Sequence, residues 1–487
     1  MRIRPRRAGG LAVLIAAAMF VLTGVAGANV PLTLVSVDPY TNTTSQHATV
    51  VEPDTFAYGS TVVATFQVGR FFNGGASDTG FVRSGDGGAT WDPPGFLHLT
   101  VNSGGPGPYE RVSDASVAYD AAHNVWLISS LPLLSDISSP TVLINRSTDG
   151  GLTWGSPISI PPPISNSVDL DKNWTVCDNN AASPFRGHCY TQFDNFGDGD
   201  RMLVSTSTDG GLTWSTPIQT PGHDKGLGGQ PVVQPSGRVI VPYESLHNSI
   251  SAFYSDDGGV SWSHEDKVAG IRFHSVAGGL RTSPLPTAEI AADGTVYVAW
   301  EDCRFRKRCA SNDIVFSKST DGANWSDPAR VPIDDVTSSV DHFIPGLAVD
   351  PATSGGGTHL AVTYYFYPDA TCSGGCQLDA GYISSPDGGA HWGAPVQLAG
   401  PMALNQIAQT SQGRMVGDYI STSFSAAGRA TTVFAVGLPA SVGFDEAMYA
   451  PASPLTVATA AQATRTASSG GVVGSIGGVG TAAVHRR

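Results

Sequence analysis

Ionisable residues are scarce in this chain, and many of them lie in short segments next to predicted strands. Charged residues make up only 14% of the 487 residues. Planar guanidinium groups pair well with carboxylates, so arginines gathered with acidic groups around one opening predict a polar ligand. The candidates are Arg111, Asp114, Asp171, Lys172, Glu244, His247, Arg281, Glu301, Asp302, Arg304, Arg306, Asp341, His342, Arg414, Asp418 and Tyr419.

Several other kinds of site are not indicated. The sequence has no G-x-S-x-G, H-E-x-x-H or P-loop motif, and His247 and His342 are interpreted as polar lining. The stretch DNFGDGD at 194–200 spaces carboxylates as a calcium loop does, but without the glutamate of the twelfth position it is interpreted as a polar hairpin. We therefore expect no metal and no cofactor. The formal net charge of −14 disfavours a nucleic-acid partner.

The six cysteines fall into three local pairs, which predicts small disulfide-closed loops in an exported protein. The pairs are Cys177 with Cys189, Cys303 with Cys309, and Cys372 with Cys376. A zinc site is the alternative, but there is no C-x-x-C motif and no histidine at ligand spacing.

Both ends of the chain differ in composition from the middle. Residues 1–28 combine four arginines, an apolar run and a final Ala-Gly-Ala, which predicts a secretory signal peptide cleaved after Ala28. No later apolar stretch approaches the roughly 20 residues of a membrane span. Cleavage would change the formal net charge from −14 to −18, because four arginines are lost. Residues 453–487 contain no aromatic residue and are predicted to be a disordered tail.

One turn sequence, Ser-x-Asp-x-Gly-x-x-Trp, recurs along the chain. STDGGLTW is present twice without change, and the copy that begins at Ser319 is one residue short, with Ala323 where glycine is usual. The aspartate can accept hydrogen bonds from its own hairpin while glycine adopts the positive φ that closes the turn. The spacing averages about 60 residues, close to the length of a propeller blade. The six aspartates are Asp86, Asp149, Asp209, Asp257, Asp321 and Asp387.

This pattern resembles the Asp box, or bacterial neuraminidase repeat, of the sialidase superfamily. The resemblance runs from about Val51 to Trp392 and implies an all-β β-propeller over residues 29–452, with the Asp box between the third and fourth strands of each four-stranded blade. Six or seven blades fit, and seven are favoured because seven first-strand segments can be identified. In the seventh blade, DEAMYA would be the third strand and the N-terminal LTLVSVDP the fourth.

The resemblance also implies a catalytic set on the face opposite the Asp boxes. Arg281, Arg304 and Arg414 would hold a substrate carboxylate, and Arg111 would replace the arginine of the Arg-Ile-Pro signature, which is absent here. Tyr419 would be the nucleophile, Glu301 its base and Asp114 the acid/base. The alternatives are that the 304–308 arginines and lysine form a solvated basic rim, and that Asp418 and Tyr419 are a buried pair that orders the last inner strand.

Two hypotheses of function follow. The first is a secreted sialidase-like glycoside hydrolase that acts on terminal acidic sugars, and the second is a non-catalytic propeller that binds glycan or protein at the same face. We expect a monomer without a membrane span, and a glycan or glycoconjugate as its partner.

Overall fold

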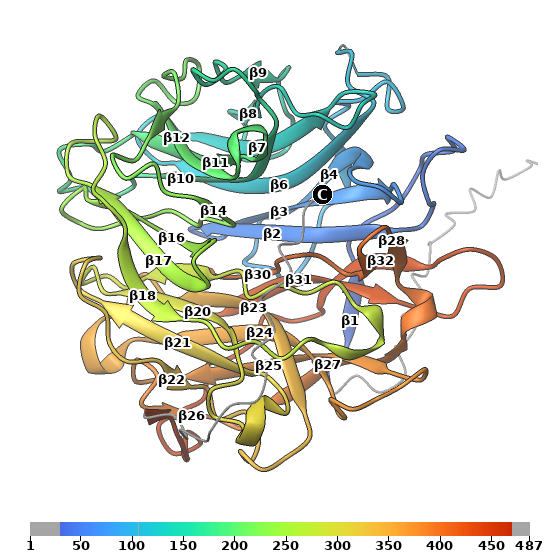
Figure 1. Ribbon diagram of the computed structural model, residues 1–487, viewed down its shortest axis with the longest axis vertical. Helices are drawn as coiled ribbons and strands as arrows, with labels where there is room; N and C mark the ends of the chain where they lie inside the picture. The colour runs from blue at the N-terminus through green and yellow to red at the C-terminus, as the bar shows by residue number, and fades with distance from the viewer. Residues whose placement is uncertain (1–29, 106, 470–487) are drawn as a thin grey trace, which may run out of the picture.

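The computed structural model describes residues 30–105 and 107–469, and within these ranges the protein is all-β. The predicted signal peptide, 1–28, and part of the predicted tail, 470–487, lie outside the described residues. Figure 1 shows sheets that follow one another around the molecule, with the colour running from blue through green and yellow to red. No helix in the described ranges is long and apolar enough to cross a membrane. The described helices are the 3-10 turns η1 (Phe196–Asp198), η2 (Ala277–Gly279), η3 (Lys307–Cys309), η4 (Gly355–Gly357) and η5 (Leu404–Gln406).

The first half of the chain forms antiparallel units whose strands pair in chain order. The first two units share one pair, Ala76 with Val112, and so belong to one eight-stranded sheet. The first unit is β2 (Val50–Tyr58), β3 (Thr61–Arg70), β4 (Ala76–Ser84) and β5 (Gly95–Phe96). The second is β6 (Arg111–Asp120), β7 (Val125–Leu133), β8 (Leu143–Ser147) and β9 (Ile158–Ser159). The third is β10 (Leu170–Cys177), β11 (Cys189–Asn195), β12 (Arg201–Ser207) and β13 (Ile218–Gln219).

The middle of the chain repeats this plan. The fourth unit has a divided first strand, β14 (Gly226–Leu227) and β15 (Val232–Val233), followed by β16 (Val239–Ser245), β17 (Ser249–Ser255) and β18 (Asp266–Gly270). The fifth unit is β19 (Thr287–Ile290), β20 (Val296–Asp302), β21 (Asp313–Ser319) and β22 (Ala329–Arg330). The sixth is β23 (Asp341–Val349), β24 (Leu360–Tyr367), β25 (Gln377–Ser385) and β27 (Val396–Ala403). A small ribbon, β28 (Ala408–Thr410) with β29 (Gly413–Met415), leads into the last unit.

The last unit joins the two ends of the chain. It consists of β30 (Ser421–Phe424), β31 (Ala430–Gly437), β32 (Glu446–Pro451) and the N-terminal β1 (Leu32–Leu34). β1 pairs with β32, the strand that contains EAMYA of the DEAMYA segment, as expected from the sequence, and Leu32 lies opposite Pro451 and Leu34 opposite Tyr449. In Figure 1 the blue β1 lies among the orange and red strands of this unit.

Hydrophobic side chains pack between successive units. One buried cluster joins Leu127 and Ile144 of the second unit to Phe193 and Leu203 of the third. Another contains Phe66 of the first unit and Phe434 of the last, so the first and last units pack against each other. These strands are rich in β-branched and aromatic residues, which favour a pleated, buried surface.

The six Ser-Asp turns share one hydrogen-bond pattern and connect the third strand of a unit to the next short strand. In each turn the serine Oγ donates to the aspartate Oδ1 at 2.8–3.0 Å and accepts from a glycine N–H at 2.8–3.0 Å. In the second turn Gly150 and Gly151 have φ of 82° and 87°, a conformation that favours glycine. The shorter fifth copy keeps the pattern, and its aspartate accepts from Asn324 N–H at 2.8 Å.

The structure contains the predicted disulfides but differs from the prediction for the tail. All three expected cysteine pairs are disulfide-bonded. The start of the tail is ordered, contrary to the prediction for 453–487. β33 (Arg465–Thr466) pairs with β26 (His391–Trp392), and β34 (Ser468–Ser469) pairs with β22. These backbone pairings do not need aromatic side chains, so composition alone could not reveal them.

Candidate functional site

The candidate site begins at irregularities in the first strands of the units. The register shifts in β2, β6, β10 and β23, as expected for a bulge that re-aims a side chain. Glu52, Asp114, Lys172 and Ile344 occupy these shifts with φ of 55°, 45°, 50° and 50°. The first three bulges thus carry ionisable groups at corresponding places in neighbouring strands.

Lys172 is the centre of the resulting charged cluster. Its Nζ lies 3.1 Å from Asp114 Oδ1 and 3.6 Å from Glu52 Oε1, and it donates a hydrogen bond to Asp418. Arg281 binds Asp418 through two donors, with Nε at 2.6 Å from Oδ1. The cluster therefore joins three first strands to the segment before β30 and the segment before β19.

A second layer of polar side chains supports the glutamate of the cluster. Gln67 on β3 donates to Glu52 and to Ser113 Oγ, the latter at 3.2 Å. Arg70 Nη1 donates to Gln67 Oε1 at 2.8 Å. Asp418 N–H donates to Glu52 Oε1 at 3.2 Å, which ties the last unit to the first.

The cluster is buried, and its charges balance. Glu52, Arg70, Asp114, Lys172, Arg281 and Asp418 are each at most 4% exposed. Burial opposes the charged state of Lys172, but Asp114, Asp418 and Glu52 outweigh this effect and raise its pKa. Burial likewise disfavours ionised Asp418, but Arg281 and Lys172 outweigh it and hold the pKa of Asp418 below its usual value. Burial raises the pKa of Glu52 to about 7 in spite of Lys172.

Tyr419 lies beside the cluster and is itself buried. Its hydroxyl donates to the carbonyl oxygen of Ala115 at 3.4 Å, and its ring contacts Trp174 edge-on at 5.1 Å. Burial, and then the charges of Glu52 and Asp114, raise the pKa of Tyr419 well above its usual value. The cavity next to Tyr419 and Lys172 measures about 10 Å³, far less than a sugar ring needs.

Glu301 and Tyr419 have different hydrogen-bond partners. Glu301, on β20, is completely buried, and its Oε2 accepts from the N–H of Ile344 at 2.7 Å. Burial raises the pKa of Glu301 well above the usual value. Glu244, at the corresponding position of β16, accepts from Ser283 Oγ at 2.9 Å, and burial raises its pKa to about 7. Glu244 thus connects β16 to the segment before β19, and Glu301 connects β20 to β23.

The four predicted arginines each have a separate partner. Arg281 binds Asp418, whereas Arg304 Nε donates to Asp302 Oδ1 at 2.9 Å. Arg414 Nη1 donates to the carbonyl of Ile407 at 2.8 Å, although its backbone carbonyl accepts from Arg281 N–H at 2.7 Å. Arg111 Nη1 donates to Asn73 Oδ1 at 2.7 Å, and its guanidinium stacks on Phe71.

Of the predicted set, the structure thus brings Asp114, Arg281 and Tyr419 to one cluster and places Glu301 and Arg304 at other contacts. Lys172 and Asp418 were candidates without an assigned role. Glu52, Gln67 and Arg70 were missed in the sequence. The available signal was the charged Glu52 directly after two valines at the start of a first strand.

One group of side chains has the spacing of a metal site. Ligand atoms of Asp313, Asp334 and His342 lie within 4.8 Å of one another. Arg306 and Arg330 both bind Asp313 and Asp334, and burial lowers the pKa of His342 to about 4. The two guanidinium groups already neutralise the carboxylates and would repel a further cation, so the group is better described as an ion-pair network.

Comparisons with known proteins agree with the repeated turns. Residues 188–346 match the family described as BNR repeat-like domain. A xyloglucanase from a Paenibacillus species is 27% identical over 203 residues, which are 39% of this chain and 18% of the relative. A sialidase from Micromonospora viridifaciens is 34% identical over 156 residues, which are 25% of this chain and 23% of the relative. The matches thus span about a fifth of the length of these curated relatives.

Two of the solved structures that match this chain are an endosialidase and an arabinanase. The phage phi92 endosialidase is 11% identical, with a TM-score of 0.49, and the match covers 88% of this chain and 69% of that one. An α-L-arabinanase from Penicillium chrysogenum is 14% identical, with a TM-score of 0.43, and the match covers 86% of this chain and 97% of that one.

Proposed function

We propose that this member of the sialidase-like BNR-repeat superfamily is a secreted seven-bladed β-propeller that binds glycans ending in acidic sugars and does not hydrolyse them. The observation that carries the proposal is that Tyr419 and Arg281 are buried and already have partners within the protein. Tyr419 donates to a backbone carbonyl, and Arg281 is bound to Asp418. A catalytic tyrosine needs an adjacent base and access to substrate.

Support for seven blades comes from contacts between the first strands. Each of the seven units places its first strand along one central cavity. Polar groups of neighbouring first strands bind one another around this cavity, including the pair that joins the last unit to the first. The pairs are Asp54 with Val117, Ser116 with Thr175, Gln230 with Ala288, Thr287 with Leu347, Thr422 with Gly346, and Ser421 with Thr55.

The Ser-Asp turns would be Asp boxes with a structural role. Their aspartates are bound within their own hairpins, and Trp214, Trp325 and Trp392 donate to a glycine carbonyl of the same turn at 3.0–3.3 Å. Gly87 N–H donates to Ser60 O at 2.7 Å, so the first turn contacts the connection between β2 and β3. Glycan recognition is therefore assigned to the opposite face.

The proposed glycan contact is the basic loop closed by Cys303 and Cys309. Lys307 and Arg308 are exposed in this loop, whereas Arg306 is buried and bound to Asp313 and Asp334. An exposed lysine and arginine can bind the carboxylate of an acidic sugar without first losing a buried partner. The disulfide fixes the loop, which lowers the conformational entropy lost on binding.

Hydrolysis of a terminal acidic sugar is the second candidate. It is supported by the local similarity to a sialidase and by Arg281, whose buried Nη1 has no hydrogen-bond partner among the described residues. In that reaction Arg281, Arg304, Arg414 and Arg111 would bind the carboxylate, with Tyr419 as nucleophile, Glu301 as base and Asp114 as acid/base. The cluster would have to open, because Tyr419 and Glu301 now have different partners.

Export would bring the protein to its glycans. The predicted signal peptide and the three disulfides support an extracellular location.

A glycan array tests the proposal. We expect the purified protein to bind glycans with terminal acidic sugars and the Lys307→Ala/Arg308→Ala variant to lose most of that binding. Arg83→Ala, which removes a partly exposed arginine bound to Asp92 in the first Ser-Asp hairpin, is the matched control. Equal binding by both variants, or no preference for acidic sugars, would refute the proposed glycan contact.

A further inference from the structure

A cavity of about 350 Å³ lies among the first strands of the seven units, separate from the charged cluster. It is lined by residues of β2, β6, β10, β15, β19, β23 and β30. Glu52 of the charged cluster precedes the lining residue Asp54 by two positions, and Tyr419 directly precedes the lining residue Ile420. The cavity therefore follows the strands away from the cluster, and a volume of this size can hold a small organic molecule.

The cavity opens where the first strands end. Tyr58, at the end of β2, and Pro351, just after β23, are exposed lining residues. The connection that follows Tyr58 contacts the first Ser-Asp turn through Ser60. The opening is thus on the side of the Ser-Asp turns, opposite the loop to which glycan binding is assigned.

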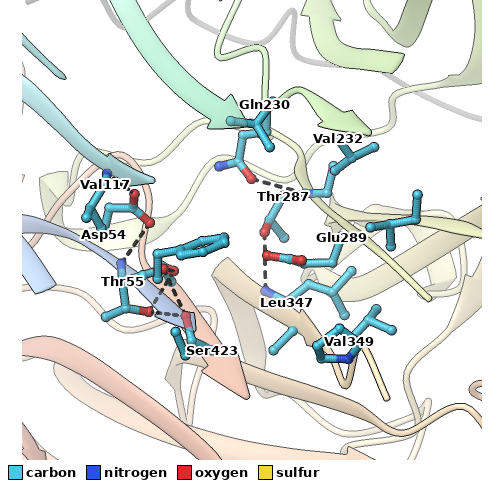
Figure 2. A pocket seen from close by; sticks show the side chains of 18 of the residues that line it. Asp54, Thr55, Val117, Gln230, Val232, Thr287, Glu289, Leu347, Val349 and Ser423 are labelled. Carbon is cyan, nitrogen blue, oxygen red and sulfur yellow. Dashed lines mark hydrogen bonds between the residues drawn. The ribbon is translucent and has the colours of Figure 1, made fainter. Parts of the chain in front are cut away.

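Carboxyl groups are the charged side chains of the lining. Asp54 and Glu289 contribute them, and the described lining residues include no lysine, arginine or histidine. Asp54 accepts from the backbone N–H groups of Thr55 and Val117, each at 2.8 Å. Figure 2 shows the carboxyl group of Glu289 directed toward the interior of the cavity, across from Asp54 and Thr55. Glu289 is half-buried and is one of the lining residues of the cavity.

The remaining walls suit the organic part of a small ligand. The rings of Phe56 and Trp174 are half-buried and line the cavity together with Val176, Val232 and Leu347. Aromatic faces attract cations as well as apolar groups, and a carboxylate provides a direct ionic partner. A small anion would meet two carboxyl groups here and no compensating positive side chain among the described lining residues.

We propose that this cavity is a second binding site, which accepts a small organic cation with a protonated amine against Glu289 and its hydrocarbon part against Phe56 and Trp174. Ligand binding in this cavity requires neither the charged cluster nor the basic loop closed by Cys303 and Cys309. Its occupation and the glycan binding proposed above can therefore be lost independently.

The proton on Glu289 gives the site a characteristic pH dependence. Burial, with a further contribution from the charge of Asp54, raises the pKa of Glu289 to about 8. The other titratable groups nearby are Asp54, whose pKa burial raises to about 7, Tyr58 in the lining, and Tyr297, the partner of Glu289 on β20. Because an ammonium group binds the ionised carboxylate, affinity rises with pH by up to roughly tenfold per unit below pH 8 and levels off above it.

Titration calorimetry with cyclohexylammonium tests the proposal, and cyclohexanol is the neutral probe of the same shape. We expect cyclohexylammonium to bind at pH 8.5 at least tenfold more tightly than cyclohexanol and to bind more weakly at pH 6.5. Glu289→Gln keeps the side-chain size and should lower the affinity at least tenfold. Glu110→Gln removes a charge from an exposed site and should leave the affinity unchanged.

Phe56→Leu is a second variant, which keeps the carboxyl group and removes an aromatic face. It should weaken cyclohexylammonium binding by a smaller factor than Glu289→Gln. Thermal unfolding of each variant checks that it is folded. Equal affinity for the two probes, affinity unchanged by Glu289→Gln, or preferential binding of a neutral sugar such as galactose would overturn the proposal.

Discussion

Lys172 and Asp114 form an ion pair of 3.1 Å between the first strands of two neighbouring units, and both side chains are buried. The two residues occupy corresponding bulges of β10 and β6, each with a positive φ. The pair is part of a network that includes Asp418, Arg281 and Glu52, so it joins the end of the chain to its beginning. This network contains four of the candidates that the sequence offers, Asp114, Lys172, Arg281 and Asp418.

Loss of Lys172 should destabilise the protein strongly. Lys172→Met leaves buried carboxylates without their cation, and the free energy of unfolding should fall by about 3 to 5 kcal/mol. Chemical denaturation measures the change, and Lys267→Met, at an exposed position, should have little effect. Adding Asp114→Asn to Lys172→Met should restore part of the stability, because the two residues are coupled. Strictly additive losses would contradict the described network.

The N-terminal strand should contribute to stability mainly through its first residue, Leu32. Leu32 on β1 is 8% exposed and belongs to the core shared by the last and first units, whereas Leu34 is 55% exposed. Leu32→Ala should lower the free energy of unfolding by about 2 to 4 kcal/mol. Leu34→Ala should lower it by less than about 0.5 kcal/mol. A reversed order in denaturation experiments would contradict the described burial of Leu32.

Stability should decrease as the pH rises from about 4.5 to 7, in part because of Glu244. Burial raises the pKa of Glu244 to about 7 in the folded protein, so the folded state keeps a proton that the unfolded chain loses near pH 4.5. Each such group lowers the free energy of unfolding by at most about 1.4 kcal/mol per pH unit within this window, and the loss persists at higher pH.

The variant Glu244→Gln isolates this contribution. It should make the decline in unfolding free energy between pH 5 and 7 shallower. The exposed Glu110→Gln should leave the slope unchanged. Identical pH profiles for Glu244→Gln and the parent protein would show that Glu244 titrates normally.

The Ser-Asp turns should be structural. The two carboxylate oxygens of Asp149 accept hydrogen bonds from Ser147 and from the backbone and hydroxyl of Thr153, and these bonds lower the pKa of Asp149 to about 2. Asp149→Ala should lower the free energy of unfolding by about 0.5 to 2 kcal/mol, as loss of a capping side chain does. Glycan binding should stay at the parental level in this variant, and a selective loss of binding would contradict the structural role.

Patterns in the sequence predicted the all-β fold, the three disulfides and the partner of the N-terminal strand. The disulfides join cysteines that are close in the chain. The pairing of the N-terminal strand followed from the count of repeats, because the last unit needed a fourth strand. The charged cluster could not be predicted, because a bulge changes the direction of Glu52, Asp114 and Lys172 and the sequence does not specify where the register shifts. The resemblance implied Glu301 as the base of Tyr419, whereas in the structure Glu301 on β20 accepts a hydrogen bond from Ile344 N–H.

Hydrolysis of a fluorogenic sialoside by the purified protein without residues 1–28 tests the central claim most directly. We predict no release of the fluorophore above the rate of a heat-denatured control between pH 4 and 8, because the hydroxyl of Tyr419 is buried and bound to Ala115. Release that disappears in Tyr419→Phe and Arg281→Ala, while both variants remain folded, would contradict the account and establish the protein as a sialidase.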